Sequence, residues 1–217
     1  MEKTYSAIIF DLDGTLLDTL EDLQKSVNTA MKVCGFPEHS LKEIRNFVGN
    51  GLQRLMELSV PNGKENPQFE KALQAFKEDY QIHCNDKTKA YHGVIPLLKK
   101  LKEHHIKMAI VSNKPDFGVK KLQEIYFKGL VEAAIGQREP LKRKPAPDMV
   151  LEALKELKAE KEKTIYIGDS EVDLATARNA GLPCISVAWG FRSKEFLEQQ
   201  GATKIVLSVE ELEKILL

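Results

Sequence analysis

The chain has 217 residues, of which 42% are hydrophobic and 29% are charged, a balance typical of a globular protein with its own core. Its 32 basic and 32 acidic residues cancel, which argues against nucleic acid as a partner because proteins that bind nucleic acid usually carry a basic excess. The apolar runs are shorter than the roughly 20 residues of a membrane helix, and the N-terminus does not resemble a secretory signal. We therefore expect a cytoplasmic protein with no membrane partner.

Strand-like and helix-like segments alternate along most of the chain. Short apolar and β-branched runs predict strands at residues 7–11, 108–113, 133–136, 164–169, 184–189 and 204–208. Apolar residues at helical spacing predict helices at residues 95–105, 117–126, 147–158, 172–181 and 193–201. Nearly continuous apolar strands that alternate with helices predict an α/β fold, in which a doubly wound parallel sheet forms a Rossmann-like core.

One region lacks this alternation. From Leu20 to about Lys89 the sequence contains only helical patterns, beginning with residues 20–36, where Leu20, Leu23, Val27 and Met31 form one apolar stripe. Some seventy residues of helix are too many for a simple crossover between strands. We therefore expect an inserted α-helical cap domain at residues 18–89, with hinges at 18–21 and 88–93, and a core formed by residues 1–17 and 90–217.

Four polar segments follow predicted strands: DLDGT at 11–15, SNK at 112–114, RKPAPD at 143–148 and GDSEVD at 168–173. In open parallel sheets, ligands bind at the carboxyl ends of the strands. If the first strand is central, Asp11, Asp13 and Asp169 converge, and their mutual repulsion calls for a divalent cation. Hard oxygen ligands favour Mg²⁺ over zinc.

These residue types suit phosphoryl transfer, in which catalysis consists mainly of positioning and charge stabilisation. Lys144 would supply a fixed positive charge, and Ser112 and Asn113 would supply neutral donors to a phosphate. Asp11 is the candidate nucleophile, which would form an aspartyl-phosphate. Asp13 is the candidate general acid and base.

In their order and spacing, the four segments resemble the four motifs of the haloacid dehalogenase-like hydrolases over nearly the whole chain. The inserted region resembles the helical cap of the subfamily that contains phosphoglycolate phosphatase and β-phosphoglucomutase. The resemblance implies that Asp11 is the nucleophile and also binds Mg²⁺ through its other oxygen. It implies that Asp13 is the general acid and base and offers its backbone carbonyl to the metal.

The same resemblance assigns roles to the later motifs. Ser112 and Lys144 would bind the phosphate, and Lys144 would also steady the nucleophile. Asp169 would be an acidic metal ligand. Asp173 would be the second acid of that motif and would act on the metal through water or from behind the direct ligands.

Substrate choice would fall to the cap, because the core handles only the phosphoryl group. Gly49 and Gly51 flank Asn50 in the segment FVGNGLQRLM at 47–56, which resembles the cap loop of phosphoglycolate phosphatases and suits backbone donors at a helix N-terminus. Arg54 could reach a substrate carboxylate. The resemblance therefore predicts a Mg²⁺-dependent phosphatase for a small phosphate monoester, with phosphoglycolate as the leading candidate.

Several alternatives stay open on the sequence. A phosphosugar mutase, an inorganic pyrophosphatase and a 5′-nucleotidase would use the same scaffold. A catalytically silent binding protein would be expected to lack one of the four motif residues, and none is missing. A metal-free haloalkanoic acid dehalogenase fits poorly with Asp13 and with the acids of 168–173. The sequence does not indicate whether the protein is a monomer or a homodimer.

Overall fold

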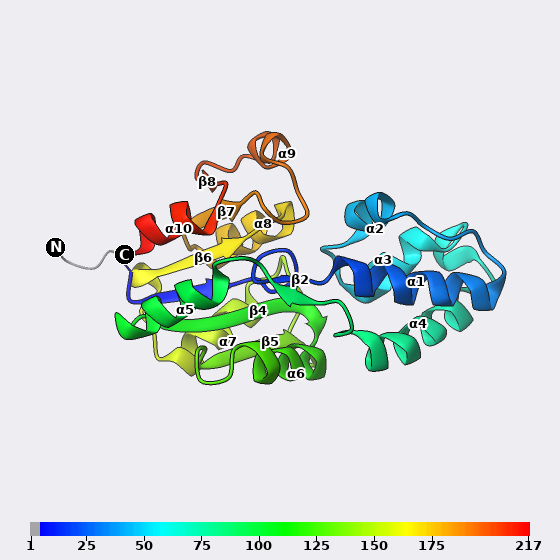
Figure 1. Cartoon of the computed structure of the whole chain (residues 1–217), viewed down its shortest axis with the longest axis horizontal. Helices are drawn as coiled ribbons and strands as arrows, with labels where there is room; N and C mark the ends of the chain where they lie inside the picture. The colour runs from blue at the N-terminus through cyan, green and yellow to red at the C-terminus, as the bar shows by residue number, and fades with distance from the viewer. Residues whose placement is uncertain (1–4) are drawn as a thin grey trace. The chain divides into compact units, whose positions relative to one another are not determined.

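The computed structural model describes residues 5–217 and divides the chain into two compact units. One unit comprises the chain up to Leu17 together with Ala90–Leu217, and the other comprises Asp18–Lys89 (Figure 1). Where the chain passes between the units, the two-residue strands β2 (Leu17–Asp18) and β3 (Lys89–Ala90) pair with each other. Strands this short leave no periodic signal in a sequence, and the analysis above did not predict them.

The larger unit contains a six-stranded parallel sheet in the order β5-β4-β1-β6-β7-β8. Its strands are β1 (Ala7–Phe10), β4 (Lys107–Pro115), β5 (Ala133–Gln137), β6 (Thr164–Gly168), β7 (Cys184–Val187) and β8 (Ile205–Val206). From β1 the chain builds outward through β4 and β5, then returns to the other side of β1 with β6. This arrangement confirms the predicted doubly wound α/β fold, and it places β1 between β4 and β6.

Helices cover both faces of this sheet. They are α5 (Val94–Glu103), α6 (Asp116–Tyr126), α7 (Asp148–Leu157), α8 (Glu171–Ala180), α9 (Lys194–Gln199) and α10 (Val209–Leu216). Alternate residues of β1 face opposite sides, so that Ile8 and Phe10 join a core with α5, α6 and α10, whereas Ala7 and Ile9 join a core with α7 and α8. Two buried faces explain why the strands are apolar throughout.

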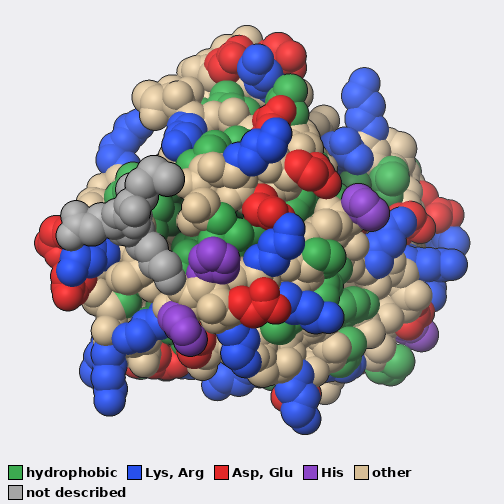
Figure 2. Space-filling view, turned by 60° about the vertical axis from the view of Figure 1, so that its left-hand side comes forward, with side chains coloured by type: hydrophobic (Ala, Val, Ile, Leu, Met, Phe, Trp, Pro, Cys, Tyr) green, Lys and Arg blue, Asp and Glu red, His purple; other side chains and the backbone are tan. Residues whose placement is uncertain are grey.

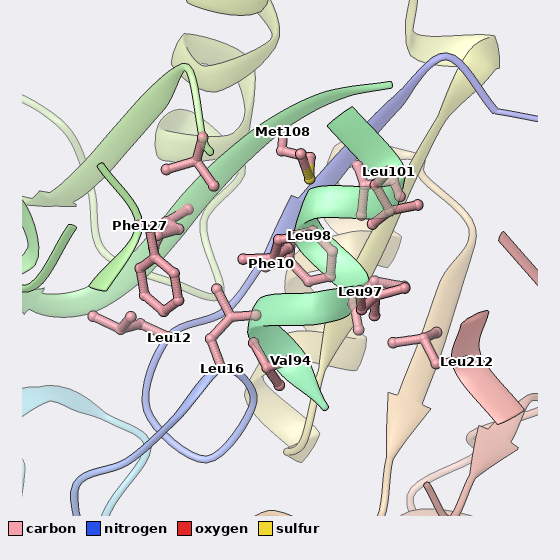
Figure 3. Close-up of a cluster of buried hydrophobic side chains, with 14 of the residues drawn as sticks. Phe10, Leu12, Leu16, Val94, Leu97, Leu98, Leu101, Met108, Phe127 and Leu212 are labelled. Carbon is pink, nitrogen blue, oxygen red and sulfur yellow. The ribbon is translucent and has the colours of Figure 1, made fainter. Parts of the chain in front are cut away.

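The first of these cores gathers around α5, whose Leu97, Leu98 and Leu101 are buried (Figure 3). They pack in one cluster with Phe10 of β1 and Met108 of β4. This packing fixes β1 and β4 from one side, and it therefore holds the segments that follow them.

The smaller unit is helical, with α1 (Leu20–Cys34), α2 (Leu41–Phe47), α3 (Gly51–Ser59), the 3₁₀ turn η1 (Gly63–Glu65) and α4 (Phe69–His83). The predicted stripe on α1 is buried at each of its four positions. The carboxylate of Asp22, also on α1, accepts hydrogen bonds from the Lys87 and Thr88 N–H groups and from the Thr88 hydroxyl at 2.7–3.1 Å. The end of this unit is thus tied to its first helix.

Two differences from the prediction lie near the C-terminus. The strand predicted at 204–208 is limited to Ile205–Val206, because Ser208 instead caps α10 by accepting a hydrogen bond from the Glu211 N–H. The helix α10 itself was not predicted.

Over the described residues of the face shown in Figure 2, lysine and arginine side chains are interspersed with aspartate and glutamate. This pattern matches the balanced charge of the sequence. Among residues 5–217, no helix is long and apolar enough to cross a membrane.

The core predicts a strong dependence of stability on Leu98. We expect Leu98→Ala to lower the free energy of unfolding by about 2–5 kcal/mol, because the deletion leaves a cavity in packed surroundings. Leu151→Ala on α7 is the matched control, since Leu151 is 49% exposed and its truncation opens no cavity. Urea unfolding of both variants would measure the difference, and equal losses would contradict this account of the core.

Candidate active site

The polar segments predicted to form a site lie together at the carboxyl ends of three adjacent strands. Asp11 follows β1, Ser112 and Asn113 lie in the second half of β4, and Asp169 follows β6. Lys144 comes from the loop between β5 and α7, and its side chain reaches the same place. The central position of β1 produces this convergence, because its two neighbours in the sheet carry the other two motifs.

The buried ammonium group of Lys144 joins two carboxylates. Its Nζ lies 2.7 Å from Asp11 Oδ1 and 2.8 Å from Asp173 Oδ1, and all three side chains are at least nine-tenths buried. The Tyr166 hydroxyl completes the cluster, 3.2 Å from Nζ and 3.0 Å from Asp173 Oδ1. The sequence analysis did not identify Tyr166, whose alternation along β6 places it in the core, because nothing in its spacing distinguishes a tyrosine at a site from one that only packs.

Asp173 has a structural role as well. Its Oδ2 accepts hydrogen bonds from the Ser170 N–H and hydroxyl, which forms the capping box at the start of α8. The resemblance predicts only the role of a site acid for this residue. In the structure its two oxygens serve both purposes, since Oδ2 caps the helix and Oδ1 contacts Lys144 and Tyr166.

Asp169 is held by groups from two loops. Its Oδ1 accepts from the Thr15 hydroxyl at 3.2 Å, and its Oδ2 accepts from the Phe191 N–H at 2.7 Å. Two glycines make this close packing feasible: a Cβ on Gly14 would lie 2.3 Å from Asp169 Oδ2, and one on Gly190 would lie 2.2 Å from the Gly14 carbonyl oxygen. Gly14 also has φ of +92°, which favours glycine.

Asp13 is paired with a second buried lysine. Its Oδ1 lies 2.7 Å from Lys114 Nζ, and its Oδ2 accepts from the Ser112 hydroxyl at 3.2 Å. The sequence analysis assigned no role to Lys114. The pairing of β4 with β5 is irregular between Val111 and Pro115, so a strand period of two was no secure signal here; the shared contact with Asp13 shows that Ser112 and Lys114 point to the same side.

Asn113 contacts the main chain of Lys144 from β4. Its Oδ1 accepts from the Lys144 N–H at 2.8 Å, and its Nδ2 donates to the Lys144 carbonyl at 3.2 Å. The side-chain amide therefore holds the main chain of Lys144, and its role as a neutral donor to phosphate stays a prediction.

Burial and like charges shift the ionisation of these groups. Burial raises the pKa of the Asp11 carboxyl well above its usual value; Lys144 opposes this rise and the neighbouring carboxylates add to it. Burial, reinforced by the charge of Asp173, raises the pKa of Asp169 to about 7 against the opposing Phe191 N–H. Burial disfavours the Lys144 ammonium ion, but Asp11 and Asp173 outweigh it and raise the pKa of Lys144.

The donor set fits a divalent cation. Asp11, Asp169 and Asp173 each offer a carboxylate oxygen, and these oxygens lie within 4.8 Å of one another. With all three ionised and Lys144 protonated, the cluster has a formal charge of −2. Oxygen ligands and this charge suit Mg²⁺, and an ion there would lower the raised carboxyl pKa values.

The remaining predicted residues lie in the helical unit. Gly49 and Gly51 have φ of +119° and +79°, in the left-handed region that a turn into α3 requires of glycine. Asn50 is the residue that precedes α3, and Arg54 on that helix pairs with Glu57 at 2.9 Å. These four residues belong to the helical unit, whereas the aspartates belong to the other unit.

Comparison with known proteins agrees with this architecture. The sequence matches the family described as haloacid dehalogenase-like hydrolase over residues 8–187. A phosphoglycolate phosphatase from Rhodobacter capsulatus is 35% identical over 190 residues, which cover 86% of this chain and 85% of that protein. Phosphoglycolate phosphatase 1 from Pseudomonas aeruginosa is 29% identical, over 94% of this chain and 77% of that protein. A crystal structure from Lactobacillus delbrueckii subsp. bulgaricus, provisionally named a phosphoglycolate phosphatase, has a TM-score of 0.94 at 38% identity, with 98% of each chain covered.

The pKa of Asp169 predicts that Mg²⁺ binding depends on pH. Below about pH 7 this carboxyl is neutral, and the metal must displace its proton. We expect the Kd for Mg²⁺ to rise as pH falls from 7 to 5.5, by about tenfold per pH unit for each proton displaced.

Calorimetric titration with MgCl₂ across this range would measure the effect. Asp169→Asn is the control and should bind weakly at every pH, with a flatter dependence. A Kd in the wild type that stays constant between pH 5.5 and 7 would contradict the assignment of Asp169.

Proposed function

The chain belongs to the haloacid dehalogenase-like hydrolases, and we propose that it is a Mg²⁺-dependent phosphatase that hydrolyses phosphoglycolate through an aspartyl-phosphate. The observation that supports this proposal best is the Asp11 carboxylate, buried 2.7 Å from Lys144 Nζ and clustered with two further carboxylates. An aspartate held in this way, at the carboxyl end of a central strand, is positioned rather than solvated. That arrangement suits a nucleophile for an anionic substrate.

In the first step, an Asp11 oxygen attacks phosphorus as the bond between phosphorus and the leaving oxygen breaks. Asp13 gives its proton to that oxygen, and glycolate leaves as the alcohol. In the second step, Asp13 takes a proton from water as the water oxygen attacks phosphorus. The bond to Asp11 then breaks, which releases phosphate and regenerates the free Asp11 carboxylate.

The other core residues would bind the phosphoryl group and balance charge. Ser112 would donate its hydroxyl to a phosphoryl oxygen, and Lys144 would hold Asp11 in place while neutralising part of its charge. Asp11, Asp169 and the Asp13 carbonyl would hold Mg²⁺ directly, whereas Asp173, the second acid of its motif, would act from behind them. The bound ion would offset the negative charge of the phosphoryl oxygens and the nucleophile.

The helical unit, Asp18–Lys89, would act as a cap that selects the substrate. Asp22 binds Thr88 at the end of this unit, and β2 pairs with β3 where the chain enters and leaves it. These links suit motion of the unit as one rigid body. The relatives from Rhodobacter and Pseudomonas are named for phosphoglycolate. We assign to Gly49, Asn50 and Gly51 the backbone donors of the cap loop, and to Arg54 the substrate carboxylate.

The first test is phosphate release from phosphoglycolate, pyrophosphate, β-glucose 1-phosphate and nucleoside monophosphates, with and without Mg²⁺. We expect release to favour phosphoglycolate strongly and to require the metal. Asp11→Asn should reduce the rate by at least about 10⁴-fold because the nucleophile is lost. Asp86→Asn, which removes an exposed carboxylate of the helical unit, is the control and should retain the wild-type rate.

The panel separates the alternatives. Metal-dependent release that needs Asp11 but favours another compound would overturn the assignment of the cap loop. Isomerisation of β-glucose 1-phosphate without release of phosphate would indicate a mutase. If no compound releases phosphate and β-glucose 1-phosphate is not isomerised, the proposed function is contradicted.

The role of Arg54 can be tested separately. We expect Arg54→Ala to raise KM for phosphoglycolate by about tenfold or more, the cost of losing a charged hydrogen bond. KM for p-nitrophenyl phosphate, which has no carboxylate, should change little. Glu57→Gln removes the partner of Arg54 without removing the guanidinium and serves as the control. An equal rise in KM for both substrates would contradict carboxylate recognition.

A further inference from the structure

Lys114 is a buried charged residue to which the proposed chemistry assigns no role. It is 5% exposed, and its Nζ lies 2.7 Å from Asp13 Oδ1. We propose that Lys114 is a positioning residue that holds the Asp13 carboxylate for proton transfer with the leaving group. This inference rests on the proposed phosphatase function and adds to it a specific dependence on the leaving group.

The geometry supports positioning because both Asp13 oxygens are fixed from one strand. Lys114 contacts Oδ1 and Ser112 contacts Oδ2, and both residues lie on the same side of β4. Lys114 N–H also donates to Ser112 Oγ at 3.1 Å, which links the two supports. Because the Ser112 hydroxyl would turn to the phosphoryl group when substrate binds, Lys114 is the contact that then holds the Asp13 carboxylate, and defined geometry is what proton transfer requires.

Space is also provided for the lysine. Gly118 lies within α6, where glycine is less favourable than alanine. A Cβ at this position would lie 3.3 Å from Lys114 Cδ and 3.4 Å from Lys114 Cγ, closer than such contacts usually are. The helix thus leaves room for the aliphatic part of Lys114 beside β4.

The two buried lysines contact different acids. Lys144 contacts Asp11 and Asp173, whereas Lys114 contacts Asp13. Burying an ammonium ion is unfavourable unless it is paired, so an apolar side chain would be the simpler way to fill this place. When Asp13 gives its proton to the leaving oxygen it becomes a carboxylate, and the Lys114 ammonium ion stabilises that product.

This role predicts that the effect of Lys114 depends on the leaving group. The alkoxide of phosphoglycolate needs a proton as it leaves, whereas p-nitrophenolate is stable without one. We expect Lys114→Met to lower kcat/KM, which reports only the steps up to departure of the leaving group, about ten- to a hundredfold for phosphoglycolate and less than about threefold for p-nitrophenyl phosphate. Lys114→Arg should recover part of the loss because it restores the positive charge.

Lys120→Met is the matched control. It removes a lysine of α6 whose Nζ lies 2.8 Å from the Asp116 carboxylate, but at the surface, and it should leave both rates unchanged. In a double-mutant cycle, Lys114→Met should add little to the loss caused by Asp13→Asn, because both changes act on one proton transfer. Lys114→Met alone leaves the Asp13 charge without its lysine partner and could fold poorly for that reason. The double variant carries neither charge of the pair, so its rates do not depend on that imbalance.

The outcomes separate this inference from the proposed function. Equal losses of kcat/KM on the two substrates would overturn the positioning role and leave the phosphatase assignment intact. Losses that multiply in the double variant would do the same, because Lys114 would then act independently of Asp13. A wild-type enzyme that hydrolyses neither ester would overturn the proposed function and this inference with it.

Discussion

Compensation of buried negative charge is the constraint on which the site depends. Asp11, Asp169 and Asp173 bring three carboxylates within 4.8 Å, and the single ammonium ion of Lys144 cannot balance them. In surroundings of low polarity such a cluster would gain protons, and the pKa of Asp169, raised to about 7, shows this tendency. The same imbalance makes this cluster suit a divalent cation.

Most side chains of the site are fixed by neighbours that take no part in the proposed chemistry. Asn113 holds the backbone of Lys144, and Ser170 holds Asp173. Gly14 and Gly190 allow the loops to approach Asp169 more closely than any side chain would permit. Preorganisation of this kind matters because a displacement of about 1 Å in a reacting group can reduce a rate substantially.

The chain separates two tasks between two units. The parallel sheet fixes the reacting groups, because strand ends packed between two layers of helices have little freedom to move. The helical unit has its own core around α1 and α4, and Asp22 on α1 binds Thr88 at the end of the unit. In the function proposed above, the cap loop selects the substrate, so this choice can vary without changes to the aspartates.

The sequence by itself determined the α/β class, the main strands of the sheet and the identity of the acidic residues, because apolar periodicity and the spacing of the motifs are local properties. It also determined membership of the hydrolase family, which the comparisons confirm. Only the tertiary structure decided which side chains of the site contact one another. The roles of Lys114 and Tyr166 and the turn of Asn113 toward Lys144 follow from contacts between residues 22 to 101 positions apart. Such contacts depend on strand order and side-chain direction, which no local pattern encodes.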